Sequence, residues 1–268
     1  MQVSSDPEFP VIDSNGVHRS IIGKIGGSKR EPRAIKYGHV QEDNVLIEMN
    51  PIPSDSREGF ILNHTNILRE ISELLKPLDL SVDISATALF SDDELEHKLA
   101  KLAGCEPDYD AWHMCENHPP DLSATNMRSA GGHLHVSFDD AKNDVNRRIE
   151  VVRSFDIYGT LPSVLLDDNV ERRKLYGKAG CYRPKYATNQ DPYDGVELRS
   201  LSNFWLGSSD LMGWAYDAVE SAILNVDRVV NITQETPEII DRVISSINNS
   251  DRNEAQDLCK YLGVSYAI

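Results

Sequence analysis

The alternation of hydrophobic and polar residues predicts two β-hairpins near the start of the chain. The first joins residues 9–13 to residues 17–22 through a Ser-Asn-Gly turn, which is typical of a tight hairpin. The second joins residues 39–41 to residues 45–50. Because neighbouring residues of a strand point to opposite faces, the last of these strands has an apolar face and a mixed face. The apolar face carries Val45, Ile47 and Met49, and the mixed face carries Leu46, Glu48 and Asn50.

Helical and strand-like segments follow in an irregular order. Residues 54–76 carry hydrophobic residues near helical spacing and predict a long amphipathic helix. The mixed order, without repeats or linkers, predicts a single α+β domain with an antiparallel sheet and a helical carboxyl-terminal part at 206–268. The other expected elements are strands at 80–90, 132–138 and 195–201, helices at 91–104, 140–158, 161–176, 206–230, 236–249 and 253–262, and a polar loop at 105–127.

The composition is that of a globular protein, but the charge is strongly negative. The 268 residues include 43 Asp and Glu against 27 Lys and Arg, a formal net charge of −16. A chain this acidic repels polyanions, so non-specific nucleic-acid binding is not expected. No apolar run reaches the roughly 18 residues of a membrane span, and no signal peptide is recognised at the first ten residues. With four widely spaced cysteines, these features predict a cytoplasmic protein with reduced thiols and no membrane partner.

Positive charge is concentrated in two glycine-containing segments. Glycine lets backbone N–H groups approach an anion closely, and nearby Lys or Arg side chains neutralise it. Two interpretations are open: a phosphate or carboxylate site, or two solvated basic loops. The basic residues are Lys24, Lys29, Arg30, Arg33 and Lys36 in the first segment, and Arg172, Arg173, Lys174, Lys178, Arg183 and Lys185 in the second.

Four further segments carry polar residues at positions i and i+2, which share one face of a strand. Each has a simpler explanation: a polar loop, a solvated strand face, structural histidines or a cross-strand ion pair. Together, carboxylates and histidines can coordinate Mg²⁺ or Mn²⁺ while the basic segments hold phosphates, a combination that suits phosphoryl transfer from a nucleotide. No Walker A, protein-kinase, dinucleotide-binding or G-x-S-x-G pattern occurs. The segments are Asp6-x-Glu8, Glu48-x-Asn50 with Gln41 across its hairpin, His133-x-His135 after a Gly-Gly pair, and Glu197-x-Arg199.

The polar loop contains cysteine and histidine residues that invite comparison with a zinc site. Their spacing is not that of a usual zinc knuckle, which favours a packed or flexible loop over a metal site. The residues are Cys105, His113, Cys115 and His118.

Six motifs in order along the chain resemble the phage-type COOH·NH2 ligase family (amidoligase type 2), a member of the glutamine synthetase and glutamate–cysteine ligase superfamily. The resemblance runs from residue 6 to about residue 205, and the last sixty residues carry no recognised motif. The motifs are Asp6-Pro7-Glu8-Phe9, Ile25-Gly26-Gly27-Ser28-Lys29, Gln41-Glu42-Asp43-Asn44 with Glu48-x-Asn50, Gly131-Gly132-His133-x-His135, Tyr176-Gly177-Lys178-Ala179-Gly180-Cys181-Tyr182-Arg183, and Val196-Glu197-x-Arg199-Ser200-Leu201-Ser202-Asn203-Phe204-Trp205.

The resemblance implies a curved antiparallel sheet forming a metal-lined funnel, with helices on its back. Residues 1–205 would be the catalytic part, 206–268 its helical end, and ATP with Mg²⁺ or Mn²⁺ the cofactors. In the resemblance, Asp6 stands in the place of a longer Glu, and Gln41 in the place of an acid. The implied metal ligands are Asp6, Glu8, Glu48, His133 and Glu197; the ATP or phosphate contacts are His135, Lys29, Lys178, Arg183 and Asn50; the substrate contacts are Gln41 and Arg30; and the catalytic residues are Arg183, Arg199 and Glu197.

The implied reaction joins a carboxylate to an amine at the expense of ATP, through an acyl phosphate, in a phage-encoded enzyme of the host cytoplasm. A metal-dependent phosphotransferase of the same superfamily and a non-catalytic nucleotide-binding relative are the alternatives. The acid and amine are left open between peptides and small molecules, as is assembly into a homo-oligomer.

Overall fold

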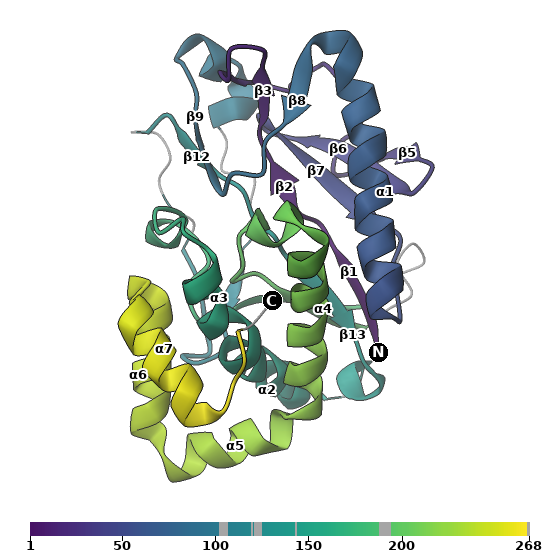
Figure 1. Ribbon diagram of the computed structural model, residues 1–268. Helices are drawn as coiled ribbons and strands as arrows, with labels where there is room; N and C mark the ends of the chain where they lie inside the picture. The colour runs from purple at the N-terminus through teal and green to yellow at the C-terminus, as the bar shows by residue number, and fades with distance from the viewer. Residues whose placement is uncertain (102–106, 119, 121–124, 143, 188–193, 267–268) are drawn as a thin grey trace.

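The computed structural model describes residues 1–101, 107–118, 120, 125–142, 144–187 and 194–266. Helices and strands are mixed, and every strand pair in these ranges is antiparallel, which confirms the predicted α+β class. Figure 1 shows the long helix α1 beside the strands of the upper half, and most other helices gathered in the lower half.

A six-stranded sheet carries one half of the site residues. Its strands follow the order β1-β13-β15-β14-β10-β11. In this register His135 and Arg183 lie opposite Glu197 on its two neighbouring strands, so the three side chains share a face. The strands are β1 (Gln2–Ser5), β10 (Tyr109–Asp110), β11 (Cys115–Glu116), β13 (Leu134–Ser137), β14 (Cys181–Lys185) and β15 (Gly195–Leu198).

A four-stranded sheet carries the other half, in the order β2-β7-β6-β5. The second predicted hairpin is confirmed as β6 and β7, joined at Asn44, which adopts a left-handed φ of 54°. Ile47 and Met49 are fully buried in the hydrophobic core that includes residues of α1, whereas Glu48 lies on the opposite face. The strands are β2 (Glu8–Phe9), β5 (Arg33–Ile35), β6 (Gly38–Asp43) and β7 (Leu46–Pro51).

Two small sheets complete the upper half. The first predicted hairpin is confirmed as β3 and β4, with β8 added on the other side of β3. The single strand expected at 80–90 was wrong: β8 and β9 belong to different sheets. β8 pairs with β3, and the backbone N–H of Asp83 extends that pairing to Pro10 O, whereas β9 pairs with β12. These strands are β3 (Val11–Asp13), β4 (His18–Arg19), β8 (Leu80–Val82), β9 (Thr87–Leu89) and β12 (Met127–Ser129).

Local capping explains where the helices begin and end. Ser56 caps α1 by accepting a hydrogen bond from the backbone N–H of Gly59, and helically spaced residues bury one face of that helix. Gly263, at a φ of 67°, ends α7. The helices are α1 (Arg57–Leu75), α2 (Val145–Phe155), α3 (Leu161–Leu166), α4 (Ser209–Leu224), α5 (Val226–Glu235), α6 (Pro237–Asn249) and α7 (Arg252–Leu262), with a π-helical turn η5 (Asp156–Thr160) and short 3₁₀ turns η1 (Lys76–Leu78), η2 (Asp93–Leu95), η3 (Lys98–Lys101), η4 (Asp139–Lys142), η6 (Arg172–Lys174) and η7 (Asn203–Gly207).

The helix expected at 206–230 is two helices, α4 and α5, which meet at Asn225. The segment 91–104 is described only to residue 101 and holds two 3₁₀ turns rather than an α-helix. Within the described ranges, none of the helices has the length and apolar character needed to cross a bilayer.

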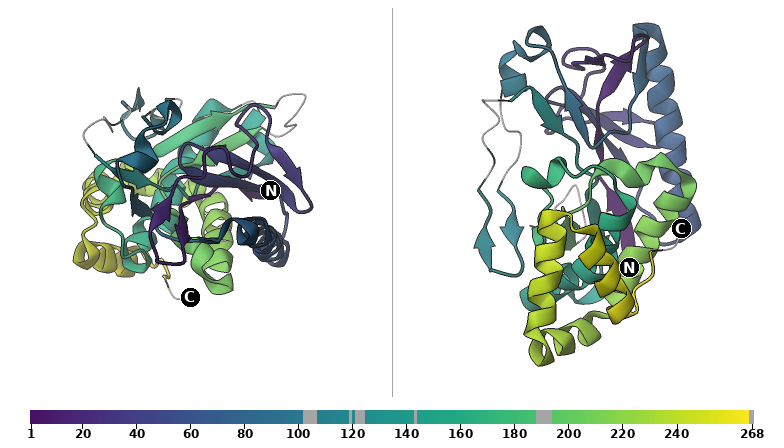
Figure 2. Two further views of the ribbon diagram at one scale, coloured as in Figure 1. Left: turned by 90° about the horizontal axis from the view of Figure 1, so that it is seen from above. Right: turned by 60° about the vertical axis from the view of Figure 1, so that its left-hand side comes forward.

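One hydrophobic core unites the sheets with α1, α2 and α4. Trp205 is the largest fully buried side chain, and its indole N–H donates to Gly132 O over 3.0 Å. Residues of α4 belong to the same core as β1, β7 and β13. A second core joins α3, α6 and α7, which Figure 2 shows packed together at the lower side of the molecule.

Candidate active site

The chain passes from the six-stranded sheet to the four-stranded sheet through Asp6, Pro7 and Glu8. The backbone N–H of Asp6 donates to His133 O over 3.3 Å, and that of Glu8 donates to Gly131 O over 2.8 Å. These two acids were expected to face one site from a single strand. Instead, Asp6 lies between β1 and β2. Asp6 and Glu8 belong to two different clusters of potential metal ligands.

The first group, which we call the histidine group, consists of Asp6, His133 and Glu197. Their ligand atoms lie within 4.8 Å of one another. His133 Nδ1 is 3.4 Å from Asp6 Oδ1 and 3.7 Å from Glu197 Oε1. His135 Nε2 adds a contact of 3.1 Å to Asp6 Oδ1.

The second group, which we call the carboxylate group, consists of Glu8, Asp43 and Glu48, again with ligand atoms within 4.8 Å of one another. Glu48 lies opposite both Glu8 and Gln41 in the sheet register. Glu8 accepts a 2.9 Å hydrogen bond from the backbone N–H of Gly131, and Gln41 donates to Glu48 Oε1 over 2.7 Å. Gln41, expected to contact substrate, therefore holds the Glu48 carboxylate in place.

Crowded negative charge in the carboxylate group favours protonation. Burial, followed by the charge of Asp43, raises the pKa of Glu8 to about 7. Burial and the charges of Asp6 and Glu8 raise the pKa of Glu48 well above its usual range, and burial also raises the pKa of Asp43. In their charged forms these three carboxylates repel one another, and a cation bound between them would offset that repulsion.

The histidine group has the opposite balance. Burial alone would raise the pKa of Asp6, but His135 and His133 outweigh it and hold that pKa well below its usual range. Burial and the Asp6 charge would likewise raise the pKa of Glu197, but Arg199 and the histidines lower it. Burial, reinforced by Arg199, lowers the pKa of His133 to about 4, so this imidazole is neutral at pH 7 and can act as a ligand.

Guanidinium groups close the histidine group on one side. Arg199 pairs with Glu197 Oε1, donates to His133 Nδ1 over 3.4 Å and contacts Asp108 Oδ2 at 3.2 Å. Arg183 Nη1 lies 3.3 Å from both carboxylate oxygens of Glu197. The predicted association of Glu197, Arg199 and Arg183 is therefore present in the structure.

Two glycines allow this close packing. A Cβ at Gly131 would collide with the imidazole of His133. A Cβ at Gly132 would collide with Ser202 O and lie 2.5 Å from the Trp205 indole nitrogen. Because both residues lack a Cβ, the backbone at Gly131 can lie against the His133 ring, and the backbone at Gly132 can lie against Ser202 and Trp205.

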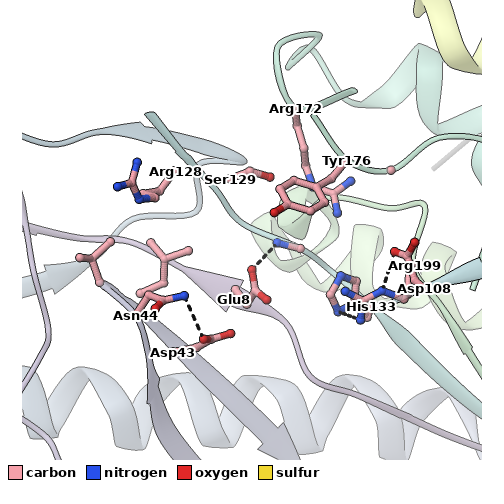
Figure 3. A pocket seen from close by; sticks show the side chains of 14 residues that line it. Glu8, Asp43, Asn44, Asp108, Arg128, Ser129, His133, Arg172, Tyr176 and Arg199 are labelled. Atoms are coloured by element: carbon pink, nitrogen blue, oxygen red, sulfur yellow. Dashed lines mark hydrogen bonds and ion pairs between the residues drawn. The ribbon is translucent and has the colours of Figure 1, made fainter. Parts of the chain in front are cut away.

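A cavity of about 60 Å³ opens beside the carboxylate group and holds arginine side chains in its wall. We call it the arginine cavity. Figure 3 shows Glu8 at its centre, with Arg172 and Tyr176 on one side and His133 and Arg199 on another.

A larger cavity of about 700 Å³, called the lysine cavity, is lined by His135, which contacts Asp6 of the histidine group. Lys29, Lys185, Asn50 and His135 line it, and Lys185 Nζ lies 3.0 Å from His135 Nδ1. Whereas His135 faces the lysine cavity, His133 lines the arginine cavity. The two histidines of one strand face thus border two different spaces.

Two predicted basic residues lie apart from the carboxylates. Lys178 donates to Asn248 O over 3.2 Å and lines a third cavity, of about 240 Å³. Arg30 follows Lys29 in the loop before β5, and its side chain is exposed.

Three site residues were not assigned a role from the sequence. Asp43 was taken as a turn residue, although β6 extends to it and strand alternation places it on the same face as Gln41. Asp108 carried no signal in the polar loop. Arg172 was counted in a basic segment without a specific role.

The zinc alternative for the polar loop falls partly outside the described residues, because Cys105 does. His113 Nδ1 lies 2.7 Å from Asp110 Oδ2, and Cys115 is exposed. Within the described part of the chain, the two clusters of potential metal ligands are the histidine and carboxylate groups, and neither includes this loop.

The donor set of both groups fits a divalent cation. Carboxylate oxygens and neutral imidazole nitrogen are ligands for Mg²⁺ and Mn²⁺. Asp6 Oδ1 and His135 Nε2 lie 3.1 Å apart as an ion pair, but neither makes an aligned hydrogen bond, and buried polar atoms in this state are suited to a bound ion. The raised pKa values of Glu8 and Glu48 show that their charged forms are unfavourable at this position, and a bound ion would stabilise those charged forms.

No family model and no curated protein matches the sequence. Among solved structures, a GmaS/ADP complex is similar with a TM-score of 0.39 and 11% identity, covering 97% of this chain and 67% of that chain. A ligand-free GmaS structure is similar with a TM-score of 0.41 and 12% identity, covering 97% of this chain and 69% of that one. Both TM-scores lie below 0.5, so the function is argued below from the residues of this chain.

Proposed function

We propose that the chain is an ATP-dependent carboxylate–amine ligase. The observation that supports this most is that Glu8, Asp43 and His133 of the two groups line the smaller arginine cavity, while His135, in contact with Asp6, lines the lysine cavity of about 700 Å³. The larger volume suits a nucleotide-sized ligand, since ligand sites typically enclose about 300–1,000 Å³. Phosphoryl transfer between anionic partners depends on this kind of charge neutralisation.

In this proposal the lysine cavity receives the phosphates of ATP. Lys29, Lys185 and His135 line it beside the histidine group, and Asn50 lies at its wall. Divalent cations held by the two groups would neutralise phosphate oxygens during transfer. The curved, metal-lined funnel implied by the resemblance belongs to the same proposal.

The substrate carboxylate approaches from the arginine cavity. Its oxygen attacks the γ-phosphorus, the bond to the β-phosphate oxygen breaks, and ADP leaves with the electron pair. Arg183 and Arg199, both in contact with Glu197, lie where they can neutralise the transferring group. The amine nitrogen then attacks the acyl carbon, phosphate leaves with the electrons of the C–O bond, and the amine proton passes to water.

A product assay tests this function. The full chain, with Mg²⁺ and ATP, is incubated with pools of acids and amines, while ADP release and product masses are followed. A ligase releases ADP steadily only when both an acid and an amine are present, and its product has the mass of acid plus amine less one water. Steady ADP release without an amine would identify a phosphotransferase instead. The absence of Mg·ATP binding in calorimetry would overturn both.

A further inference from the structure

Glu42 places its carboxylate against the backbone of the loop between β4 and β5. Its Oε1 accepts hydrogen bonds from the N–H groups of Ile25 and Gly26 over 2.8 and 2.7 Å. Its Oε2 accepts a third hydrogen bond, from the N–H of Gly23 over 2.7 Å. Backbone N–H groups that converge in this way bind an anion strongly. The N–H groups of this loop, which its sequence offered to a bound anion, are therefore used by a carboxylate of the chain itself.

The same loop is fixed at two further points. Gly27 O accepts a hydrogen bond from the backbone N–H of Glu42 over 3.4 Å, and a Cβ at Gly27 would lie 2.5 Å from Val40 O. The backbone at Gly27 therefore lies directly against β6. Arg33 Nη1, at the start of β5, donates to Ile25 O over 2.6 Å. The Glu42 carboxylate thus belongs to a set of contacts that fasten the loop to β6.

Lys29 and Arg30 form the tip of a tight turn within the fastened loop. The backbone N–H of Ser28 donates to Glu31 O, and that of Glu31 donates to Ser28 O, each over 3.0 Å. The Lys29 side chain is exposed and lines the lysine cavity. Burial raises the pKa of Asp43, and the positive charge of Lys29 opposes that rise. The ammonium group therefore lies within electrostatic reach of the carboxylate group as well as at the cavity.

We propose that Glu42 is a positioning residue, which fixes the loop so that Lys29 meets the phosphate chain of a nucleotide in the lysine cavity. This inference rests on the proposed function. Among the described residues, those that line the arginine and lysine cavities do not include Glu42, so it acts through the backbone of the loop. A lysine binds phosphate as a point charge on a flexible stem, so a fixed backbone lowers the entropy lost when the charge is placed.

The sign of the effect separates positioning from simple charge. Glu42 is negative, so by charge alone its removal would strengthen the binding of an anionic nucleotide. If Glu42 positions Lys29, its removal weakens that binding, because the turn loses its strongest attachment to β6. The two explanations therefore predict changes of opposite direction in one dissociation constant.

Isothermal titration calorimetry of the full chain with Mg·ADP measures that constant without turnover. Lys29→Met is expected to raise the Kd about tenfold, through the loss of a charge-assisted contact. Glu42→Ala should raise it by at least about threefold. The double substitution should raise it no further than Lys29→Met alone, because Glu42 acts through Lys29. A double variant whose effect equals the product of the two single effects would overturn the proposal.

Glu70→Ala is the matched control. It removes the same charge from a carboxylate that accepts the backbone N–H of Lys36 over 2.9 Å, at the other end of the first basic segment. Its Kd for Mg·ADP should be unchanged or lower. If Glu42→Ala fails to fold, Glu42→Gln keeps one acceptor oxygen, replaces the other by an amide NH₂ group, and should still raise the Kd. An unchanged or lower Kd in the Glu42 variant that folds would contradict the positioning role.

A second probe, tripolyphosphate with Mg²⁺, separates this inference from the proposed function. A working ligase whose Mg·ADP binding is indifferent to Glu42→Ala would remove the inference and leave the function standing. A chain that forms no amide, but binds tripolyphosphate more weakly in Glu42→Ala than in Glu70→Ala, would remove the ligase function and leave the positioned lysine. A wild type that binds neither Mg·ADP nor tripolyphosphate would overturn both.

Discussion

Glu48 and Glu197 occupy matching positions in the two sheets. Glu48 lies between Glu8 and Gln41 on its neighbouring strands, and Glu197 lies between His135 and Arg183. Each is therefore flanked on both sides by a polar side chain of the same face. The sequence indicated both acids because each begins an i, i+2 polar pair, but it gave no indication of which strands would lie beside them.

We expect Glu48→Gln and Glu197→Gln each to lower ligase turnover by at least about a hundredfold without unfolding the protein. An amide keeps the shape but loses the negative charge that a divalent cation requires. Steady-state ADP release and circular dichroism check the two parts of this prediction. Glu238→Gln, at an exposed position of α6, is the control. A wild-type rate in either site variant would contradict the proposed ligand role.

Arg183→Ala should lower kcat by a larger factor than it raises KM for ATP. The Arg183 guanidinium lies 3.3 Å from the Glu197 carboxylate, which in the proposed reaction stands beside the transferring phosphoryl group. An interaction that strengthens only in the transition state affects kcat rather than binding. Initial rates over a range of ATP concentrations separate the two constants, and a larger effect on KM would assign Arg183 to ground-state binding.

His64 predicts how stability depends on pH. Its Nδ1 lies 2.7 Å from Phe60 O and its Nε2 lies 2.6 Å from Ser5 Oγ, so a neutral ring satisfies both partners. Burial lowers the pKa of His64 to about 4, below its unfolded value near 6.5. The folded state then binds fewer protons, so this contribution is fully present above pH 6.5 and is lost as the pH falls towards 4.

The full loss in the free energy of unfolding, reached below pH 4, is about 3 kcal/mol, and about 2 kcal/mol of it falls between pH 7.5 and pH 5. Urea unfolding at pH 7.5 and pH 5 measures it, with His64→Gln as the variant that lacks the titrating ring. Equal pH dependence in the two proteins would show that His64 does not cause it.

At the scale of elements, periodic segments were predicted well and strands defined by their partners were not. The two hairpins and α1 followed from alternation and helical spacing within their own sequences. No strand was predicted at β14, which lies in the second basic segment and contains Pro184 and two cations. It is a strand because Arg183 and Lys185 pair with the neighbouring β15, an effect of tertiary context that local propensity does not contain.

The turn before β13 allows a test at the element scale. Gly132→Ala should lower the free energy of unfolding by about 1–3 kcal/mol, because the new Cβ collides with Ser202 O beside the buried Trp205. At Gly207 the nearest atom to a new Cβ is Leu211 Cδ1 at 3.6 Å, so Gly207→Ala should change stability by less than about 0.5 kcal/mol. Urea unfolding compares the two. Similar effects of both substitutions would contradict this account of the Gly-Gly pair.

At the scale of the whole molecule, the site lies where the two larger sheets meet. The α+β class and the antiparallel pairing were predictable from the mixture of hairpins and helices. The division of the strands between two sheets was not, because it depends on contacts between segments far apart in the chain, such as the bridge between Val3 and Ser54.

Cations bound at the histidine group and at the carboxylate group should stabilise the folded state of the whole molecule. Saturating Mn²⁺ is expected to raise Tm by several degrees, because it binds the folded arrangement and relieves repulsion among buried carboxylates. Differential scanning calorimetry with Mn²⁺ and with EDTA measures the shift. The shift should shrink in Glu48→Gln and persist in Glu238→Gln, and equal shifts in both variants would place the ion elsewhere.

The short passage through Pro7 has a consequence for how this chain can vary. Pro7 O accepts a hydrogen bond from the backbone N–H of Met49, so the segment is anchored between its two acids. Inserting or deleting one residue there would turn the side chains of β1 or of β2 to the opposite face of its sheet. Length changes should therefore accumulate in the outer loops of any natural variants, while the spacing of Asp6 and Glu8 stays at two.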